Sequence, residues 1–112
     1  MRAFAEIVAG VYERRAGLLA VAATAAEADE ALAALQARSY RRRLRDCTAV
    51  VNRLHDDSWL DPAFTMNEAA DTVYALSSPE VYLVLRKQRR LPHSRYAGWL
   101  AGTLAAALRT AD

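Results

Sequence analysis

The apolar residues of this chain recur every three or four positions, which is the period of an α-helix. Over residues 2–23 this stripe consists of Phe4, Ile7, Val8, Val11, Tyr12, Leu18 and Leu19. The pattern therefore predicts a first helix over these residues. Thr24 and Glu27 follow with the spacing of a capping box, in which a threonine hydroxyl and a glutamate carboxylate satisfy free amides at a helix start. We expect a turn at residues 23–26 and a second helix capped by Thr24.

The second helix is predicted to be long. Its apolar seam alternates spacings of four and three, and it consists of Ala33, Ala37, Tyr40, Leu44, Cys47, Val51 and Leu54. Such a seam predicts one continuous apolar face, although a break near Ser39 would divide it into two helices. Turn-forming residues then surround Trp59 in the stretch 56–62. They predict a loop that the tryptophan anchors and that ends at Thr65.

The stretch of residues 66–85 is mostly apolar and is divided by Pro79. Thr65 and Glu68 form a second capping-box pattern, so a helix is predicted to begin directly after Thr65. Proline lacks an amide proton, and its ring crowds the preceding turn. The helix must therefore kink or restart at Pro79, with Ser78 as the N-cap of the new segment.

The run of residues 81–85 would by itself fit a buried strand as well as a helix, because Val-Tyr-Leu-Val-Leu has no period of its own. Pro79 and Glu80 suit the first turn of a helix, and the cationic residues within 86–90 suit its end. No second strand-like run is available to pair with it, so we prefer the helix. A last helix is predicted to open at Pro92 and to carry small residues on its apolar face.

The composition indicates one all-α domain. The chain has 112 residues, 54% of them hydrophobic, with only four glycines and three prolines. A chain of this size can form one core that buries roughly 65% of its unfolded surface. We predict about five helices in an antiparallel bundle over residues 1–112. Cys47 is the only cysteine, so no intrachain disulfide is possible, and we expect a cytoplasmic protein. The apolar residues 17–26 are far fewer than the roughly 20 that a membrane span needs.

The chemistry-bearing residues give little indication of an enzyme. Fifteen basic and thirteen acidic residues leave a net charge of +2, and the arginines within 38–45 fit a solvated helix face better than a phosphate site. Residues 55–57 (His-Asp-Asp) point in different directions at a helix end, so a turn is preferred over a metal site completed by His93. The sequence places no base beside Cys47. Without a phosphate loop or a nucleophile motif, we predict no catalytic residue, no metal and no cofactor.

Polar groups inside the apolar stripes indicate a ligand cavity instead, because each buried polar group must find a partner or bind something. The alternative for each tyrosine is a core position whose hydroxyl reaches the surface or a backbone carbonyl. We predict that a mostly apolar small molecule binds between the first helix, the second helix and the helix that ends at Ser78. Asp71 is the one candidate charge, which favours neutral or cationic ligands. The predicted ligand-binding residues are Tyr12, Leu19, Tyr40, Leu44, Cys47, Val51, Asp71, Tyr74, Ser78 and Tyr82.

The sequence EAADTVYALSSPEVYLVL at 68–85, followed by LPHSRYAGWLAGTLAAAL at 91–108, resembles the C-terminal part of TetR-type bacterial transcriptional regulators. The Arg-rich stretch 38–54, the turn around Trp59 and the opening FAEIVAGVYERRAGLLAVA extend this likeness more weakly over most of the chain. The resemblance implies a ligand-binding and dimerisation domain. Nothing in the chain matches the helix-turn-helix domain of such regulators, so we expect no sequence-specific DNA binding by this chain alone.

A homodimer through residues 66–88 and 92–109 is predicted from the all-round apolarity of 81–85 and the small residues around Trp99. The resemblance implies a four-helix interface, to which each subunit contributes two such helices. The predicted interface residues are Val73, Val81, Leu85, Tyr96, Trp99, Leu100, Thr103, Leu104 and Ala107. Two functions stay open: a small-molecule-sensing and dimerisation domain, and an interaction-only module that takes no ligand and pairs with a full-length regulator.

Overall fold

The computed structural model describes residues 1–110 and, within them, all side chains except those of residues 16–24. The elements are α1 (Arg2–Ala28), α2 (Glu30–Asp56), α3 (Met66–Leu76), α4 (Pro79–Leu83), the π-helical turn η1 (Val84–Gln88) and α5 (His93–Leu108). These helices, with no strand among the described residues, confirm the predicted all-α class of about five helices.

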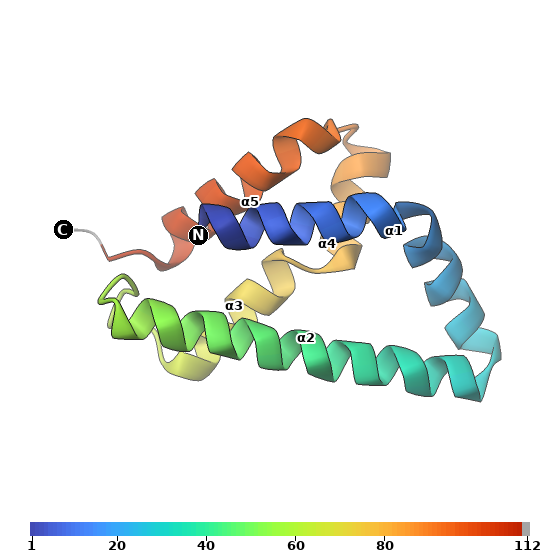
Figure 1. Ribbon diagram of the computed structural model, residues 1–112, viewed down its shortest axis with the longest axis horizontal. Helices are drawn as coiled ribbons and strands as arrows, with labels where there is room; N and C mark the ends of the chain where they lie inside the picture. The colour runs from blue at the N-terminus through green and yellow to red at the C-terminus, as the bar shows by residue number, and fades with distance from the viewer. Residues whose placement is uncertain (111–112) are drawn as a thin grey trace.

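Helix α1 forms the middle of the molecule. It packs against α5, α2 and α4, and α3 packs against both α2 and α5. Figure 1 shows α2 along one long edge and α5 along the opposite edge, with α1 crossing between them. The N-terminus and the end of α5 lie at the same end of the molecule, which measures 47 × 29 × 19 Å. The start of α1 and the end of α5 can therefore contribute to one site.

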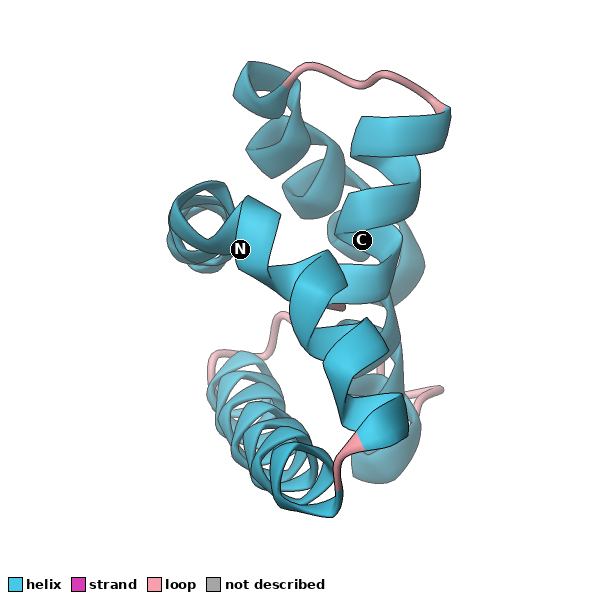
Figure 2. Cartoon of the chain, turned by 90° about the vertical axis from the view of Figure 1, so that its right-hand side faces the viewer, coloured by secondary structure: helices cyan, strands magenta, loops and turns pink. Residues whose placement is uncertain are grey.

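The connection between α1 and α2 differs from the prediction. Helix α1 continues past Thr24, and the turn consists of Asp29 alone in an extended conformation (φ −140°, ψ 118°). The Asp29 carboxylate accepts hydrogen bonds from the amides of Ala31 (2.8 Å) and Leu32 (3.2 Å) and so caps α2. Figure 2 views the molecule from this end, where the turn is a short loop between the two long helices. The turn predicted at residues 23–26 is wrong because alanines continue a helix readily and aspartate caps better than threonine.

Helix α2 runs unbroken through Ser39 and ends in a Schellman motif. The amide of Trp59 donates to the carbonyl of Leu54 (2.9 Å), and the amide of Ser58 donates to that of His55 (3.0 Å). Ser58 has the left-handed conformation that this motif requires (φ 58°). The motif also brings the side chains of Trp59 and Leu54 together, because these are the two positions whose apolar residues meet at such a helix end.

The central segment begins and restarts as the sequence indicates. Thr65 and Glu68 form a capping box, with amide to side-chain distances of 3.1 and 3.2 Å. The Ser78 hydroxyl caps α4 by accepting from the amide of Val81 (3.1 Å), and Pro79 occupies the first helical position. The helical interpretation of residues 81–85 is confirmed.

The end of this segment lies among the cationic residues as predicted, but its π-helical form was not predicted. After α4 the chain widens into η1, which ends where Arg90 adopts a left-handed conformation (φ 55°). The amide of Leu91 then donates to the carbonyl of Leu85 (2.9 Å). Nothing in the spacing of the cationic residues distinguishes a π-helical turn from an α-helical one.

The core lies between α1, α5 and the C-terminal part of α2. Its buried residues are Ala5, Ala9, Tyr12, Cys47, Val51, Leu54, Leu60, Ala69, Ala70, Val73, Tyr82, Tyr96, Leu100, Leu104 and Leu108. The seam predicted for α2 is buried only at its C-terminal end: Cys47 and Val51 are 2% and 1% exposed, whereas Leu44 is 42% exposed. Ala33 is exposed as well. The first half of α2 projects beyond α3, and its apolar residues Leu32, Ala33 and Leu35 are exposed.

Candidate functional site

The candidate site is a group of three buried tyrosines, which we call the tyrosine cluster: Tyr12 from α1, Tyr82 from α4 and Tyr96 from α5. The ring centroids of Tyr82 and Tyr96 are 4.8 Å apart in an edge-on arrangement, and those of Tyr12 and Tyr82 are 5.2 Å apart. The third pair, Tyr12 and Tyr96, is separated by 6.3 Å. All three distances fall in the range in which aromatic rings attract each other.

Two of the three hydroxyls have partners. Tyr12 donates to the backbone carbonyl of Ser77 at 2.5 Å, and the Tyr82 hydroxyl lies 3.1 Å from Nδ1 of His93. His93 is bonded in turn through Nε2 to the carboxylate of Glu13 at 3.1 Å. The hydrogen-bonded series Tyr82–His93–Glu13 thus connects the cluster to the surface, because the His93 side chain is 25% exposed and that of Glu13 is 66% exposed.

The third hydroxyl, that of Tyr96, has no hydrogen-bond partner among the described residues. The whole residue is 0% exposed, so water does not reach it from the surface. A buried hydroxyl without a partner costs about 1–3 kcal/mol of stability. Tyr96 is therefore the one member of the tyrosine cluster whose polar group the chain does not satisfy.

The acceptor for Tyr12 exists because of the proline break. In a continuous helix the amide of Val81 would donate to the carbonyl of Ser77. Here that amide donates to the hydroxyl of Ser78, which leaves the Ser77 carbonyl free for Tyr12. The Ser77 hydroxyl donates to the carbonyl of Val73 at 2.6 Å. Local sequence thus creates a buried acceptor, and α1 supplies its donor.

Arg43 marks the rim of the site on the α2 side. Its guanidinium lies 3.8 Å from the centroid of the Tyr74 ring and donates to the Tyr74 carbonyl at 2.9 Å. It also donates to the Ser77 hydroxyl at 3.5 Å, while its Nε has no partner among the described residues. Nearby, the Tyr40 hydroxyl donates to the carboxylate of Glu80 at 3.2 Å. These contacts connect α2 to the proline break.

Burial sets the protonation of the site. It raises the pKa of the Tyr12 and Tyr96 hydroxyls above the ordinary tyrosine value, against a smaller lowering effect of Arg43. Burial also raises the pKa of the Cys47 thiol, whose sulfur is 3.9 Å from the Ser77 hydroxyl. All three groups are thus neutral near pH 7, so the tyrosines can donate hydrogen bonds and Cys47 is no thiolate nucleophile.

The structure brings together only part of the predicted ligand set. Tyr12, Cys47, Val51, Ser78 and Tyr82 are buried, and Tyr40 and Tyr74 lie partly buried at the rim. Asp71 and Leu44 are exposed, so their assignment to a buried cavity between the helices is wrong; Leu44 instead faces an open groove on the outer side of α2. The side chain of Leu19 lies outside the described residues.

Sequence reasoning missed Tyr96, Ser77, His93 and Arg43 as site residues. A signal existed for Arg43, which follows Tyr40 by three residues and precedes Cys47 by four, so it lies on the seam side of α2 rather than on the solvated face. Tyr96 was assigned to a dimer interface instead. His93 lies 11 residues from Tyr82 along the chain, across a bend that no local pattern indicates.

The predicted dimer interface needs the same kind of correction. Val73, Tyr96, Leu100 and Leu104 are 0% exposed, so they belong to the core of one chain and are wrong as surface residues. The reason is that α1 packs on α5 and covers this face. The other predicted residues retain some exposure: Val81, Leu85, Trp99, Thr103 and Ala107.

Two cavities formed by described residues lie away from the tyrosine cluster. One, of about 380 Å³, lies where the chain ends meet the loop after α2. The other, of about 580 Å³, is an open groove on the outer side of α2 that Leu44 and Arg45 help to line. The cluster is therefore packed in this conformation, and a molecule that binds there must displace a side chain or move a helix.

Comparison of the chain with family models, with curated proteins and with solved structures found no match. None of the described helices combines the length and the apolar character that crossing a membrane requires. Over residues 1–110, side chains of the metal-binding types form no group of three. The tyrosine cluster and the two cavities must therefore be interpreted from their own geometry.

Proposed function

We propose that this chain is the small-molecule-sensing and dimerisation domain of a TetR-like bacterial regulator and that it works in the cytoplasm. The observation that carries the sensing half is the buried Tyr96 hydroxyl without a partner. A ligand that presents one acceptor to this hydroxyl would remove a penalty that the empty chain carries. The tyrosine rings around it offer the apolar and aromatic surface that small-molecule sites favour.

The chemistry of the cluster narrows the ligand. Asp71 is exposed and cannot set a charge preference, and the nearest partly buried charge is the cation of Arg43. Arg43 is already engaged with Tyr74 and Ser77. The proposed ligand is therefore a neutral, mostly apolar molecule with a carbonyl or ether oxygen as the acceptor.

Binding would be coupled to the helix that follows the proline break. Tyr82 lies on α4, a five-residue helix that continues into the π-helical turn η1. Short π-helical turns occur often at functional sites. A ligand that displaces the Tyr82 ring would also break the hydrogen bond to His93 and so move the connection to α5. Since α4 and α5 belong to the segments proposed for the dimer interface, this movement would couple ligand binding to dimerisation.

Thermal unfolding with a panel of neutral aromatic ketones and ethers tests this proposal. A true ligand at a hundred times its dissociation constant is expected to stabilise the fold by about 2.7 kcal/mol. Tyr96→Phe should weaken binding because it removes the donor, whereas Tyr40→Phe at the rim should not. If no member of the panel raises the melting temperature, or if both variants respond alike, the sensing function at this cluster is wrong.

The dimer is tested separately, by light scattering. Thr103→Arg places a charge on the partly exposed side of α5 and should shift the mass toward a monomer. Ser94→Arg adds the same charge at the exposed start of that helix and serves as the matched control. A wild-type monomer at tens of micromolar, roughly the range of a modest interface, would contradict the homodimer.

The interaction-only module is the second candidate, and one observation favours it. The Tyr12 hydroxyl, one of the predicted ligand donors, is already satisfied by the chain's own Ser77 carbonyl. In this version the chain pairs with a full-length regulator and gives a dimer with one DNA-binding head. Co-purification with such a regulator, without any heat stabilisation by small molecules, would favour it.

Neither version includes sequence-specific DNA binding by this chain alone. The exposed arginines of α2 can still bind duplex weakly through its phosphates, and such binding falls as salt rises. We expect no preference for one duplex over a scrambled one at about 0.15 M salt, near physiological ionic strength. A retained preference in a gel-shift competition would contradict this.

A further inference from the structure

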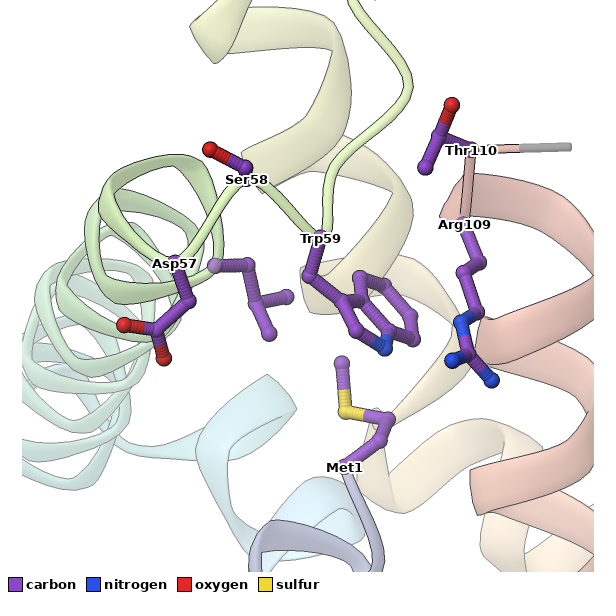
Figure 3. Close-up of a pocket in the computed structure, with 7 residues that line it drawn as sticks. Met1, Asp57, Ser58, Trp59, Arg109 and Thr110 are labelled. Atoms are coloured by element: carbon purple, nitrogen blue, oxygen red, sulfur yellow. The ribbon is translucent and has the colours of Figure 1, made fainter. Parts of the chain in front are cut away.

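A second site candidate lies at the opposite side of the core from the α1–α2 turn, where the chain ends meet. Figure 3 shows this cavity of about 380 Å³, which we call the Trp59 cavity. Its walls come from the end of α2, the loop that follows, the start of α1 and the end of α5, through Met1, Leu54, Asp57, Ser58, Trp59, Arg109 and Thr110. None of these residues belongs to the predicted ligand set or to the tyrosine cluster.

Backbone hydrogen bonds hold the central wall in place. The Trp59 amide donates to the carbonyl of Leu54 (2.9 Å), and the Trp59 carbonyl accepts from the amide of Thr110 (3.1 Å). The next residue of the loop, Leu60, forms an antiparallel bridge with Arg109, and the Asp61 amide donates to the end of α5 at 2.8 Å. The backbones of Trp59 and Arg109 are thus fixed before any ligand arrives. A preorganised site loses less free energy to ordering when it binds.

Arg109 supplies a cation to this cavity. The Arg109 guanidinium carbon is 5.9 Å from the centroid of the Trp59 ring, near the outer limit of a cation–π contact. Arg43, by comparison, lies 3.8 Å from the Tyr74 ring and donates two hydrogen bonds. Arg109 is exposed and forms no ion pair with any described residue.

The acidic residue of the cavity is already paired. The Asp57 carboxylate lies 3.3 Å from Nε of Arg53 on the surface of α2. Figure 3 shows this carboxylate turned away from the indole ring, whereas the Arg109 side chain extends alongside it. The face of Trp59 that the cavity presents is therefore next to a positive charge and not next to a negative one.

From this geometry we propose that the Trp59 cavity binds a small aromatic carboxylate. The ring of the ligand lies against the indole of Trp59 and the apolar side chains of Leu54 and Met1. Its carboxylate accepts the paired N–H donors of Arg109, which match a carboxylate in geometry and charge. A volume of about 380 Å³ is at the lower end of known ligand cavities and suits a molecule of one ring. This site does not depend on the function proposed for the tyrosine cluster.

Three probes, each with one benzene ring and a different functional group, test the charge preference of the Trp59 cavity. Benzoate, benzylamine and benzyl alcohol are titrated by calorimetry into the full chain, and Trp59 fluorescence is followed in the Trp99→Phe variant. Benzoate is expected to bind with a dissociation constant on the order of 1 mM, as for a ligand of about ten heavy atoms. Benzylamine and benzyl alcohol should bind at least about tenfold more weakly, because only benzoate gains the charge-assisted contact.

Matched variants locate the site. Arg109→Gln should lower the benzoate affinity about tenfold, while Arg95→Gln removes the same charge at the other end of α5 and should not change it. Tyr96→Phe should also leave benzoate binding unchanged, which separates this site from the tyrosine cluster. The proposal is overturned if benzoate binds no tighter than benzyl alcohol. It is also overturned if the two arginine variants behave alike, or if no saturation occurs up to about 20 mM. Arg109 is exposed, so its variant tests the site without threatening the fold.

Discussion

The two halves of α2 carry apolar residues at the same spacing, but only the later half, which ends at Asp56, has these residues buried. The earlier half, which begins at Glu30, does not. Val51 is 1% exposed, whereas Ala33 of the same seam is exposed; Leu35, on the opposite face of the helix, is 50% exposed. Helix α2 is about 40 Å long and α3, which packs along it, is only about 16 Å long at 1.5 Å per residue. Figure 1 shows α3 beside the later half of α2, while the earlier half extends toward the turn to α1.

An apolar seam thus predicts the presence of a helix more reliably than it predicts that the apolar face of this helix is buried. The period records which residues share a face, but burial needs a second element long enough to cover that face. Where cover is present, α2 contributes Cys47, Val51 and Leu54 to the core. Where it is absent, apolar side chains such as Leu32 and Leu35 remain on the surface. Four experiments test this comparison between the two halves of α2.

The largest effect on the free energy of unfolding is expected from a charge placed in the buried half of α2, compared with the same charge in the exposed half. Val51→Asp buries a carboxylate without a partner and should lower the free energy of unfolding by more than about 3 kcal/mol, or prevent folding. Leu35→Asp should change it by no more than about 0.5 kcal/mol. Urea denaturation followed by circular dichroism measures both. Equal effects would mean that the first half of α2 is covered in solution, for example by a partner chain.

Alkaline pH should destabilise the core to which the later half of α2 contributes. Burial raises the pKa of Tyr12 and Tyr96, so the unfolded chain releases these protons at a lower pH than the folded chain. Their contribution is complete below the unfolded tyrosine pKa of about 10 and is lost as pH rises above it. Cys47, whose pKa burial also raises, adds to the loss from about pH 8.5.

The check is urea denaturation at several pH values from neutral upward, on the wild type and on Tyr96→Phe. The free energy of unfolding should fall with pH in both, and less steeply in the variant because it has one group fewer to ionise. A free energy that stays constant through the ionisation range of tyrosine would show that these hydroxyls are not buried.

The stability of the exposed half of α2 should depend more on its Asp29 cap than on its apolar residues. Asp29→Ala removes the acceptor for two amides and is expected to lower the free energy of unfolding by about 1 kcal/mol. Thr24→Ala, at the position where the sequence alone predicted the turn, should be neutral or slightly stabilising because alanine has the higher helix propensity. Chemical denaturation of the two variants decides between the turn positions, and a larger loss for Thr24→Ala would restore the predicted one.

The smallest effect is expected at the end of the buried half. Ser58 has a left-handed backbone (φ 58°), which costs a residue with a β-carbon about 1 kcal/mol. Ser58→Gly should therefore raise the free energy of unfolding by roughly 0.5–1 kcal/mol. The measurement is a shift of the urea midpoint at unchanged slope. A loss of stability would mean that the Ser58 side chain makes a contact in solution.

Several features that depend on residues at most four positions apart could be predicted from the sequence alone. The capping box of Thr65 and Glu68 and the restart at Ser78 and Pro79 follow from bonds within one helical turn, and each was predicted. The helical state of residues 81–85 follows from the same signals. Local hydrogen bonding limits these choices so strongly that no distant residue needs to take part.

Tertiary structure decided which apolar faces are covered and which polar groups meet. Tyr96 was assigned to a dimer interface and Tyr12 to a ligand cavity, yet the two rings lie together in one core. An apolar helix face has the same pattern whether the chain's own helix or a partner covers it, so the sequence could not separate these cases. Arg43 meets Tyr74 across 31 residues, and Trp59 meets Arg109 across the whole second half of the chain. Contacts of this kind exist only after the helices have packed, because the position of each depends on the length and direction of every element between them.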